Sequence, residues 1–353
     1  MELLKDKKIG LALSGGGYRA AAFHLGVLSY MAENNLLENV THISTVSGGS
    51  LVTGLIYKLN NYKWPTSEEY LSNVHEQAIN ILKNTDLLEE EGWLAGIISW
   101  ITNGKYAAHE VVVDKLQKIW KIDINFQRLD DTPIWTINTT TGETGKSCRF
   151  EKSEMSDYKL GKILKPNFNL ADILAASAGF PIVIGPLNVD LAKHNFRPKK
   201  GIRHKKISLY DGGLYDNLGT EVFFQGNFSR LPDHVDFLVV SDASKPFKIH
   251  EDMYSAGRKS KAKHIVNIST EQIRSLRSRM VHSLIKTKGE PDSGLYIRLG
   301  SKESGSSEEI KCAESVATSL KGLSSSEMDC LLANGFHAAR MDFEKYSEDM
   351  HDD

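Results

Sequence analysis

The first sixty residues contain two strand–turn–helix units in direct succession. The apolar segment KKIGLAL (7–13) ends in glycines and precedes YRAAAFHLGVLSYMAENN (18–35), whose apolar residues recur at helical spacing. The segment VTHISTV (40–46) repeats this plan ahead of a second predicted helix over 49–61. Two successive strand-to-helix passages favour parallel strands joined by crossover helices. We therefore expect an α/β fold with a mainly parallel central sheet and flanking helices.

The remainder of the chain adds further predicted elements, and the region 61–130 is mainly helical. Strands are predicted at 133–141, 206–210, 236–242, 263–269 and 294–300. Helices are predicted over 271–287 and 324–343, and GSKESGSSEEI (300–310) is predicted to be a surface loop. We expect residues 1–353 to form one domain, with its motifs within about 8–220 and with 235–345 belonging to the same unit.

Charge, cysteine usage and hydropathy exclude several classes of protein. A formal net charge of −2 gives no indication of a nucleic-acid partner. The three cysteines are far apart and lack CxxC spacing, which argues against a disulfide framework or a zinc site and fits a reducing compartment. The N-terminal apolar run is too short for a signal segment, and no stretch approaches the roughly 18 apolar residues of a membrane span. We expect a cytoplasmic protein, able to lie peripherally at a membrane, without metal or cofactor.

The first glycine-rich turn, LSGGGYRA (13–20), is open to three interpretations. Gly15, Gly17 and Ala20 satisfy the dinucleotide pattern G-x-G-x-x-A, but the second strand ends in Val46-Ser47-Gly48 without the acidic residue that a ribose requires. A tight turn is one remaining interpretation. The other is a nest of backbone N–H groups beside a helix N-terminus, which binds anions and can serve as an oxyanion hole.

The second turn, ISTVSGGSL (43–51), places a serine between a strand and a helix. A nucleophile elbow is usually spelled G-x-S-x-G, and this chain has Thr45-Val46-Ser47-Gly48-Gly49. Alone, this spelling is also typical of a plain turn. Because adjacent parallel strands bring their carboxyl ends to one sheet edge, a glycine nest one unit earlier favours a nucleophile.

A serine nucleophile needs a base, and SLYDGGLYDNLG (208–219) supplies the leading candidate. Asp211 follows a predicted strand and precedes Gly212-Gly213, so we expect it at the same edge, although Asp-Gly is also a common turn. An unshifted Asp, with a pKa of about 3.9, is a weak base, and partial burial would raise that pKa. A Ser–Asp–His triad stays open, because five histidines follow Asp211: His234, His250, His264, His282 and His337.

Taken together, these blocks resemble the patatin-like phospholipases. The glycine nest with its arginine, the serine elbow and Asp-Gly-Gly stand in the family's order over about residues 8–220. ADILAASAGFPIVIGPL (171–187) and GGLYDNLG (212–219) are similar to further family segments. The Ser-Gly-Gly spelling is closer to the cytosolic-phospholipase branch than to plant patatins. The resemblance implies a three-layer α/β/α fold and hydrolysis of fatty-acyl esters of lipids.

The resemblance also implies roles for individual residues. Ser47 would be the nucleophile and Asp211 its base, in a dyad without histidine. The oxyanion hole would consist of backbone N–H groups of Gly15, Gly16 and Gly17, helped by Gly48. Arg19 would order the glycine loop, the alternative being a helix-surface arginine, and the supporting glycines would be Gly49, Gly212 and Gly213. The departures from the family pattern are Ser14 in place of Asp, Ala20 in place of Gly and Thr45 in place of Gly.

The implied substrate is a phospholipid or another acyl-ester lipid, cleaved by phospholipase A or lysophospholipase chemistry through an acyl-enzyme. A small-ester or acyl-CoA hydrolase and a catalytically silent lipid-binding scaffold are the alternatives. Two segments could make transient contact with a membrane surface. Trp93–Ile101 suits a lid or interfacial anchor, unless it is a core helix, and the basic stretch Arg197–Lys206 could attract anionic headgroups, unless it is a solvated loop.

Overall fold

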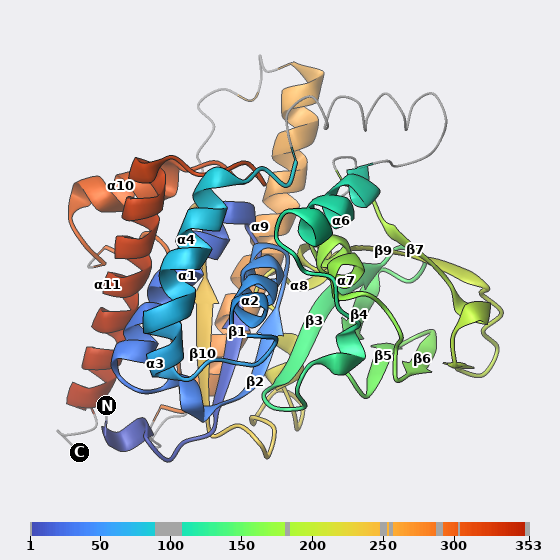
Figure 1. Cartoon of the computed structure of the whole chain (residues 1–353), viewed down its shortest axis with the longest axis horizontal. Coiled ribbons are helices and arrows are strands. Elements are labelled where there is room, and N and C mark those ends of the chain that lie inside the picture. The colour runs from blue at the N-terminus through green and yellow to red at the C-terminus, as the bar shows by residue number, and fades with distance from the viewer. Residues whose placement is uncertain are drawn as a thin grey trace.

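The fold is that of a computed structural model, which describes residues 2–88, 108–180, 184–247, 253, 257–286, 292–302 and 304–349. Within these residues eleven strands belong to one sheet. The strands are β1 Ile9–Leu13, β2 Val40–Thr45, β3 Ile134–Thr141, β4 Lys146–Phe150, β5 Glu154–Asp157, β6 Gly161–Leu164, β7 Leu187–Asp190, β8 Phe196–Pro198, β9 Lys206–Asp211, β10 Phe237–Asp242 and β11 Gly294–Arg298. Their order is β11-β10-β1-β2-β3-β4-β5-β6-β8, and β9 pairs with both β3 and β7 (Figure 1).

Helices cover both faces of this sheet. The α-helices are α1 Gly17–Glu33, α2 Gly48–Leu59, α3 Ser67–Glu69, α4 His75–Asn84, α6 Ala108–Lys118, α7 Leu170–Ser177, α8 Gly213–Asp216, α9 Arg258–Ile285, α10 Ser307–Ser315 and α11 Ser325–Asp349. Short helical turns are η1 Glu2–Leu4, η2 Leu37–Asn39, η3 Tyr70–Val74, η4 Phe126–Arg128, η5 Leu191–Lys193 and η6 Glu221–Phe223. Figure 1 shows α1, α2, α4 and α11 on one face of the sheet and α9 on the other.

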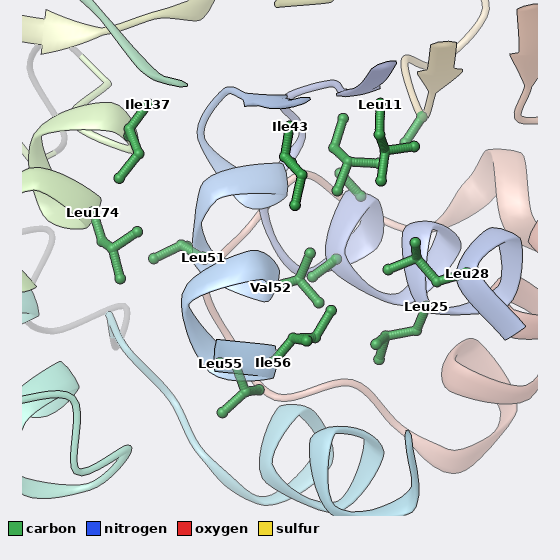
Figure 2. Packing of buried hydrophobic residues seen from close by; sticks show 14 of the residues in the cluster. Leu11, Leu25, Leu28, Ile43, Leu51, Val52, Leu55, Ile56, Ile137 and Leu174 are labelled. Atoms are coloured by element: carbon green, nitrogen blue, oxygen red, sulfur yellow. The ribbon is translucent and has the colours of Figure 1, made fainter. Parts of the chain in front are cut away.

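Alternation along the strands assigns side chains to the two faces. In β1, Leu11 and Leu13 join the large core under α1 and α2, whereas Ala12 joins a smaller cluster with Val281 and Leu284 of α9. Figure 2 shows the large core, where α2 contributes Leu51, Val52, Leu55 and Ile56 and the strands contribute Leu11, Ile43 and Ile137. Full burial of each such side chain stabilises the fold by about 1.5–3 kcal/mol, so this layer anchors the N-terminus of α2.

The predicted fold class is confirmed. The strands β11, β10, β1, β2 and β3 are mutually parallel, and the first two strand–turn–helix units occupy the predicted residues. The sequence did not indicate the antiparallel extension formed by β4, β5, β6, β8, β7 and β9, apart from β9 itself. Most of these strands are only three to five residues long and mix charged with apolar residues, so the period-two signal is weak.

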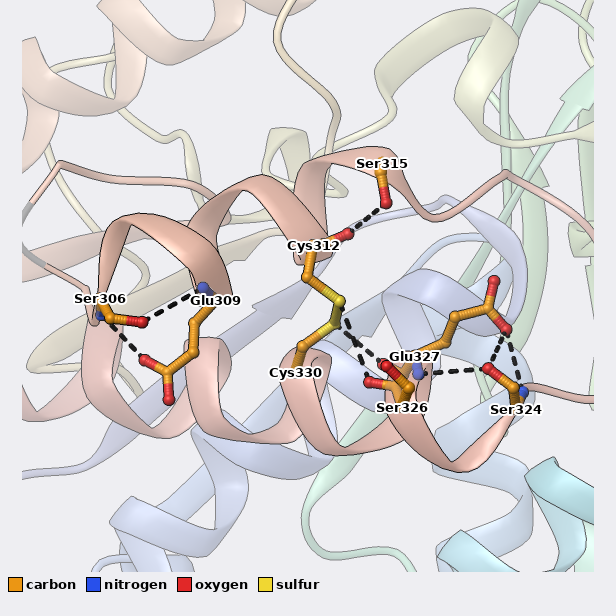
Figure 3. The surroundings of a disulfide bond; sticks show 8 residues. All are labelled: Ser306, Glu309, Cys312, Ser315, Ser324, Ser326, Glu327 and Cys330. Carbon is orange, nitrogen blue, oxygen red and sulfur yellow. Dashed lines mark hydrogen bonds between the residues drawn. A yellow bond between two sulfur atoms is a disulfide. The ribbon is translucent and has the colours of Figure 1, made fainter.

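The predicted strand at 263–269 is wrong, because these residues lie in the 28-residue helix α9. Ile265 and Ile268 are 61% and 42% exposed, so they do not fill a sheet core. The flanking helical sequence outweighs a short run of β-branched residues. The loop predicted at 300–310 is confirmed only in its first part, since Ser306 caps α10 in a capping box with Glu309 (Figure 3).

The expectation against disulfides is wrong for one pair of cysteines. Cys312 of α10 and Cys330 of α11 form a disulfide with their Cα atoms 6.2 Å apart (Figure 3). The two helices pack side by side, an arrangement that the spacing of 18 residues does not reveal. Cys148 is a buried free thiol. Among the described residues, no helix combines the length and the apolar character needed to cross a membrane.

Candidate functional site

The glycine turn connects β1 to α1 through a backbone that side chains rarely adopt. Gly16 and Gly17 have φ angles of 146° and 63°, in the region that favours glycine. The N–H of Tyr18 donates to the carbonyl of Ser319, 2.9 Å away, so the segment between α10 and α11 covers this turn. The conformation of the turn is therefore stabilised by its own glycines and by the hydrogen bond to Ser319.

Ser47 stands at a strained position between β2 and α2. Its φ of 50° and ψ of −116° lie in a region that costs a non-glycine residue about 1–3 kcal/mol. The Ser47 N–H donates to Oγ of Ser177 at 3.1 Å, and the Ser47 carbonyl accepts from the N–H of Leu51 at 2.9 Å. These bonds and the buried core under α2 hold the strained turn, which is the geometry of a nucleophile elbow.

The N-termini of α1 and α2 meet at this point. A Cβ atom on Gly48 would lie 2.9 Å from the Gly17 nitrogen and closer still to the Gly17 carbonyl oxygen. Only glycine permits this approach. The two helix dipoles therefore direct their positive ends to one place, which favours a negative charge there.

Asp211 reaches Ser47 because β2 and β9 lie on the same side of β3. Thr45, the last residue of β2, pairs with Ile137 of β3. Two residues further along β3, Thr139 pairs with Asp211, the last residue of β9. Because β9 runs antiparallel to β3 while β2 runs parallel to it, the ends of β2 and β9 face each other. The predicted proximity of Asp211 to the elbow is thus realised by an antiparallel strand.

The Ser47 hydroxyl lies close enough to the Asp211 carboxylate to lower its pKa, and the N–H of Gly213 donates to Oδ1 of Asp211 at 2.7 Å. Asp211 is 6% exposed and Ser47 is 9% exposed. Burial raises the pKa of Asp211 to about 6, and the Gly213 N–H and the nearby Ser47 hydroxyl limit this rise. The carboxylate is therefore a much better proton acceptor near neutral pH than an exposed aspartate.

The backbone N–H groups of the glycine turn differ in availability. The N–H of Gly15 donates to the carbonyl of Asn217 at 3.0 Å, so this group is already engaged and does not fit the predicted oxyanion hole. None of the hydrogen bonds found among the described residues uses the N–H of Gly16, Gly17 or Gly48. The first N–H groups of a helix lack intrahelical acceptors, so these three are free to bind an oxygen atom.

Arg19 is buried and is not a helix-surface arginine. It is 3% exposed, and its guanidinium donates to the carbonyls of Ala243 and Val316 and to the hydroxyl of Thr318. Burial lowers the pKa of Arg19 to about 10, and the nearby charge of Asp242 opposes this effect, so the side chain stays cationic at neutral pH. Arg19 thereby ties the start of α1 to the segments after β10 and after α10.

Behind the glycine turn, His24 joins two strand ends. Its Nε2 donates to the Ser14 carbonyl at 2.9 Å, so Nδ1 of the neutral ring accepts from the Ser241 hydroxyl at 2.7 Å. Burial lowers the pKa of His24 to about 4. Oγ of Ser14 accepts a hydrogen bond from the N–H of Ala243 at 2.8 Å. The serine that replaces the family's aspartate thus connects the glycine turn to the residue after β10.

The histidines that sequence analysis left open as bases contact other residues. His234 bonds His42, His282 packs on Tyr296, His264 packs on Phe247 and His337 lies beside Glu309. His250 lies outside the described residues. None of the four described histidines is among the groups that interact with the Asp211 carboxylate, whereas the Ser47 hydroxyl is.

Sequence analysis missed several residues that position this pair. Oγ of Ser177 accepts from the Ser47 N–H, lies 2.8 Å from Oγ of Ser50 and donates to the Asn138 carbonyl at 2.8 Å. The hydroxyl of Thr45 lies 2.8 Å from Ser50 and accepts from the indole of Trp135, which accommodates threonine at the elbow. Ser177 lies within the segment 171–187, so its position between small residues was the available signal.

The remaining predicted residues divide into those at the site and those away from it. A Cβ atom on Gly49, Gly212 or Gly213 would crowd the Leu13 carbonyl, Asn138 or Asn217 respectively, so all three allow close packing around the pair. The basic stretch 197–206 runs from β8 to the first residue of β9, and Lys206 lies five residues, about 17 Å, from Asp211. The segment Trp93–Ile101 lies outside the described residues.

Comparison with known proteins places these features in a family. A sequence profile described as patatin-like phospholipase matches residues 11–224. Human GIVD cytosolic phospholipase A2 is similar in structure, with a TM-score of 0.56, 12% identity, and coverage of 96% of this chain and 63% of that chain. VipD from Legionella pneumophila has a TM-score of 0.44 and 16% identity, with coverage of 97% and 67%. A search of curated protein sequences finds no match.

These findings establish the fold and the family, and no more. The chain spans less than two thirds of the human phospholipase, and at 12% identity the likeness concerns the fold. The profile match covers more than half of the 353 residues and includes both glycine turns, Ser47 and Asp211. This chain belongs to the patatin-like phospholipase family.

Proposed function

We propose that this protein hydrolyses fatty-acyl esters of lipids, with Ser47 as nucleophile and Asp211 as base. The observation that carries the proposal is the placement of the Ser47 hydroxyl, at its strained elbow, beside the buried Asp211 carboxylate. Family membership supports a lipid as the substrate. The reaction would be of the phospholipase A or lysophospholipase type.

In the first step, Oγ of Ser47 attacks the ester carbonyl while its proton moves to the carboxylate of Asp211. The carbonyl oxygen becomes an oxyanion, which accepts hydrogen bonds from the N–H groups of Gly16, Gly17 and Gly48. The two helix N-termini add electrostatic stabilisation at the same place. The bond between carbonyl carbon and alcohol oxygen then breaks, and Asp211 returns the proton to the leaving alcohol.

In the second step, water attacks the acyl-enzyme by the same route. Asp211 accepts a proton from the water, the oxyanion forms again in the hole, and the fatty acid leaves as Ser47 recovers its proton. A base with a pKa of about 6 suits both steps, since it is mostly ionised at neutral pH and still binds a proton during transfer. No histidine is required.

Arg19 and His24 support this chemistry without touching the reacting atoms. Arg19 fixes the residues after β10 and after α10 against the glycine turn, and His24 fixes Ser14. The N–H groups of the hole are thus oriented before the substrate binds, which is how an enzyme avoids reorganisation during the reaction.

The test is covalent labelling with a fluorophosphonate, read as intact mass. We expect one adduct on the wild-type protein, no adduct on Ser47→Ala and slower adduct formation on Asp211→Asn. The matched controls are Ser72→Ala and Asp233→Asn, which alter exposed residues away from the site and should label like wild type. An active wild-type preparation that takes no adduct, or a Ser47→Ala protein that is labelled, would remove the serine mechanism.

Substrate class is tested on the same proteins. Release of fatty acid from phosphatidylcholine and lysophosphatidylcholine should exceed hydrolysis of a short p-nitrophenyl ester and of palmitoyl-CoA. A preference for the short ester or the CoA thioester would instead indicate a small-ester or acyl-CoA hydrolase. Binding of phospholipid without turnover, together with no adduct, would indicate a lipid-binding scaffold.

A further inference from the structure

A second feature of the molecule is a cavity of about 710 Å³ on the antiparallel part of the sheet. Neither Ser47 nor Asp211 lines it. Five cationic side chains do so, those of Lys146, Arg149, Lys162, Arg197 and Lys199, against three carboxylates. We propose that this cavity is a binding site for a ligand that carries a phosphate group with at least two negative charges. The site does not rest on the proposed acyl hydrolysis.

The cations form a row that crosses four strands. Arg149 of β4 pairs with Ser156 of β5, Ser156 pairs with Lys162 of β6, and Lys162 pairs with Arg197 of β8. Residues directly opposite each other in antiparallel strands project from the same face, with Cβ atoms about 4.5–5.5 Å apart. Like charges in such positions destabilise a sheet, and Lys162 stands directly opposite Arg197. A bound anion would remove this repulsion.

The carboxylates of the cavity neutralise only part of its positive charge. Glu154 bonds Lys162 at 2.7 Å, and Glu221 pairs with Arg149 at 3.5 Å and also with Arg277 of α9. Asp157 accepts from the backbone N–H groups of residues 159 and 160 and from the hydroxyl of Thr144.

Three cations of the cavity have no carboxylate partner among the described residues. In the described part of the chain, no carboxylate lies within salt-bridge distance of Lys146, Arg197 or Lys199. The wall therefore carries excess positive charge in a protein whose net charge is −2.

Arg149 has one donor that the protein does not use. Its Nε is buried and has no hydrogen-bond partner among the described residues. A buried guanidinium N–H without an acceptor is unfavourable, and a bound ion is one explanation for such a group. The planar fork of arginine suits phosphate oxygens, because it donates two parallel hydrogen bonds.

Two tyrosines give the cavity aromatic walls. Tyr158 is 78% exposed, and the ammonium of Lys199 lies 4.4 Å from the centre of its ring. Tyr215 belongs to α8, which begins two residues after Asp211, and donates its hydroxyl to Glu221 at 3.0 Å. The cavity thus combines charged and aromatic groups, a composition that suits a phosphorylated organic compound or the headgroup of an anionic lipid better than a fatty-acyl chain.

The experiment measures binding of two probes to the full chain. Inorganic pyrophosphate, titrated by calorimetry, represents a soluble phosphate compound. Phosphatidylcholine vesicles with and without phosphatidic acid, tested by co-sedimentation, represent a lipid headgroup. We expect saturable binding of at least one probe: pyrophosphate binding identifies a soluble ligand, and binding only to phosphatidic acid vesicles identifies a headgroup.

Variants locate the binding. Arg149→Gln, Lys162→Gln and Arg197→Gln should each weaken binding by about tenfold, because each removes a charged hydrogen-bond donor. The matched controls are Arg203→Gln and Lys205→Gln, which lie in the same basic stretch outside the cavity and should change affinity by less than about twofold. Lys162 and Arg197 are exposed, so these two variants test the site even if Arg149→Gln fails to fold. No saturable binding of either probe, or an equal loss in the controls, would overturn the proposal.

Discussion

The raised pKa of Asp211 predicts that replacing this residue stabilises the protein above pH 5 while reducing catalysis. Burial raises the pKa from an ordinary value of 3.8 to about 6, so the folded protein holds this proton more tightly than the unfolded chain does. Protonation of Asp211 therefore makes its full contribution to the free energy of unfolding below pH 3.8, and this contribution is lost as the pH rises through about 6. Asp211→Asn has no carboxylate to bury, so its free energy of unfolding does not decrease in this way as the pH rises.

The magnitude follows from the two pKa values. One pH unit corresponds to about 1.4 kcal/mol, so the ionised carboxylate reduces the free energy of unfolding by about 3 kcal/mol at pH 8. At pH 5 the same linkage amounts to about 2 kcal/mol, since Asp211 is then mostly protonated in the folded state. The free energy of unfolding of Asp211→Asn relative to wild type should thus grow by about 1 kcal/mol between pH 5 and pH 8.

The assay is urea unfolding of both proteins across this pH range, followed by circular dichroism. Ser47→Ala is the informative partner variant, because it removes a hydroxyl that lowers the pKa of Asp211. Its stability should fall with pH more steeply than that of the wild type. A difference between Asp211→Asn and wild type that is constant from pH 5 to pH 8 would refute the assignment of a buried, proton-accepting carboxylate.

Three further predictions concern the glycine turn and its supports. Gly48→Ala should abolish fluorophosphonate labelling, because its Cβ atom would force the N-termini of α1 and α2 apart, whereas Gly257→Ala, with nothing within 4 Å, should label normally. Reduction of the disulfide should lower the free energy of unfolding by about 3 kcal/mol, because the bond between Cys312 and Cys330, 18 residues apart, restricts the unfolded chain. The variant Cys330→Ser should unfold identically with and without reductant. Identical unfolding curves of the wild type under the two conditions would contradict the prediction. Arg19→Met should cost about 2 kcal/mol in urea unfolding and slow labelling, since it leaves buried carbonyls without donors; unchanged labelling at reduced stability would show that Arg19 does not order the turn.

Much of the fold could be predicted because its signals are local. The strand–turn–helix units over 7–61 follow from apolar periodicity and from glycines at the turns, and both occupy the predicted residues. Ser47 and Asp211 were identified by the same means, since each stands where a strand ends in a glycine turn. The family resemblance rests on the order of these turns along the chain.

Other predictions failed because the deciding signal lies outside the segment on which each prediction was based. The run at 263–269 is β-branched, yet it belongs to a helix whose length is determined by its flanks. Cys312 and Cys330 lack a motif, and only the packing of α10 on α11 pairs them. The N–H of Gly15 is occupied by Asn217, which lies some two hundred residues further along the chain.

The sequence by itself determined which residues stand at the strand ends, because turn chemistry and periodicity act over a few residues. The tertiary structure alone decided what those residues face. It placed the end of β9 opposite the end of β2, buried Asp211 beside Ser47 and thereby raised its pKa. It also aligned Arg149, Lys162 and Arg197 in one row. Strand register and burial depend on partners far away in the chain, so no local pattern records them.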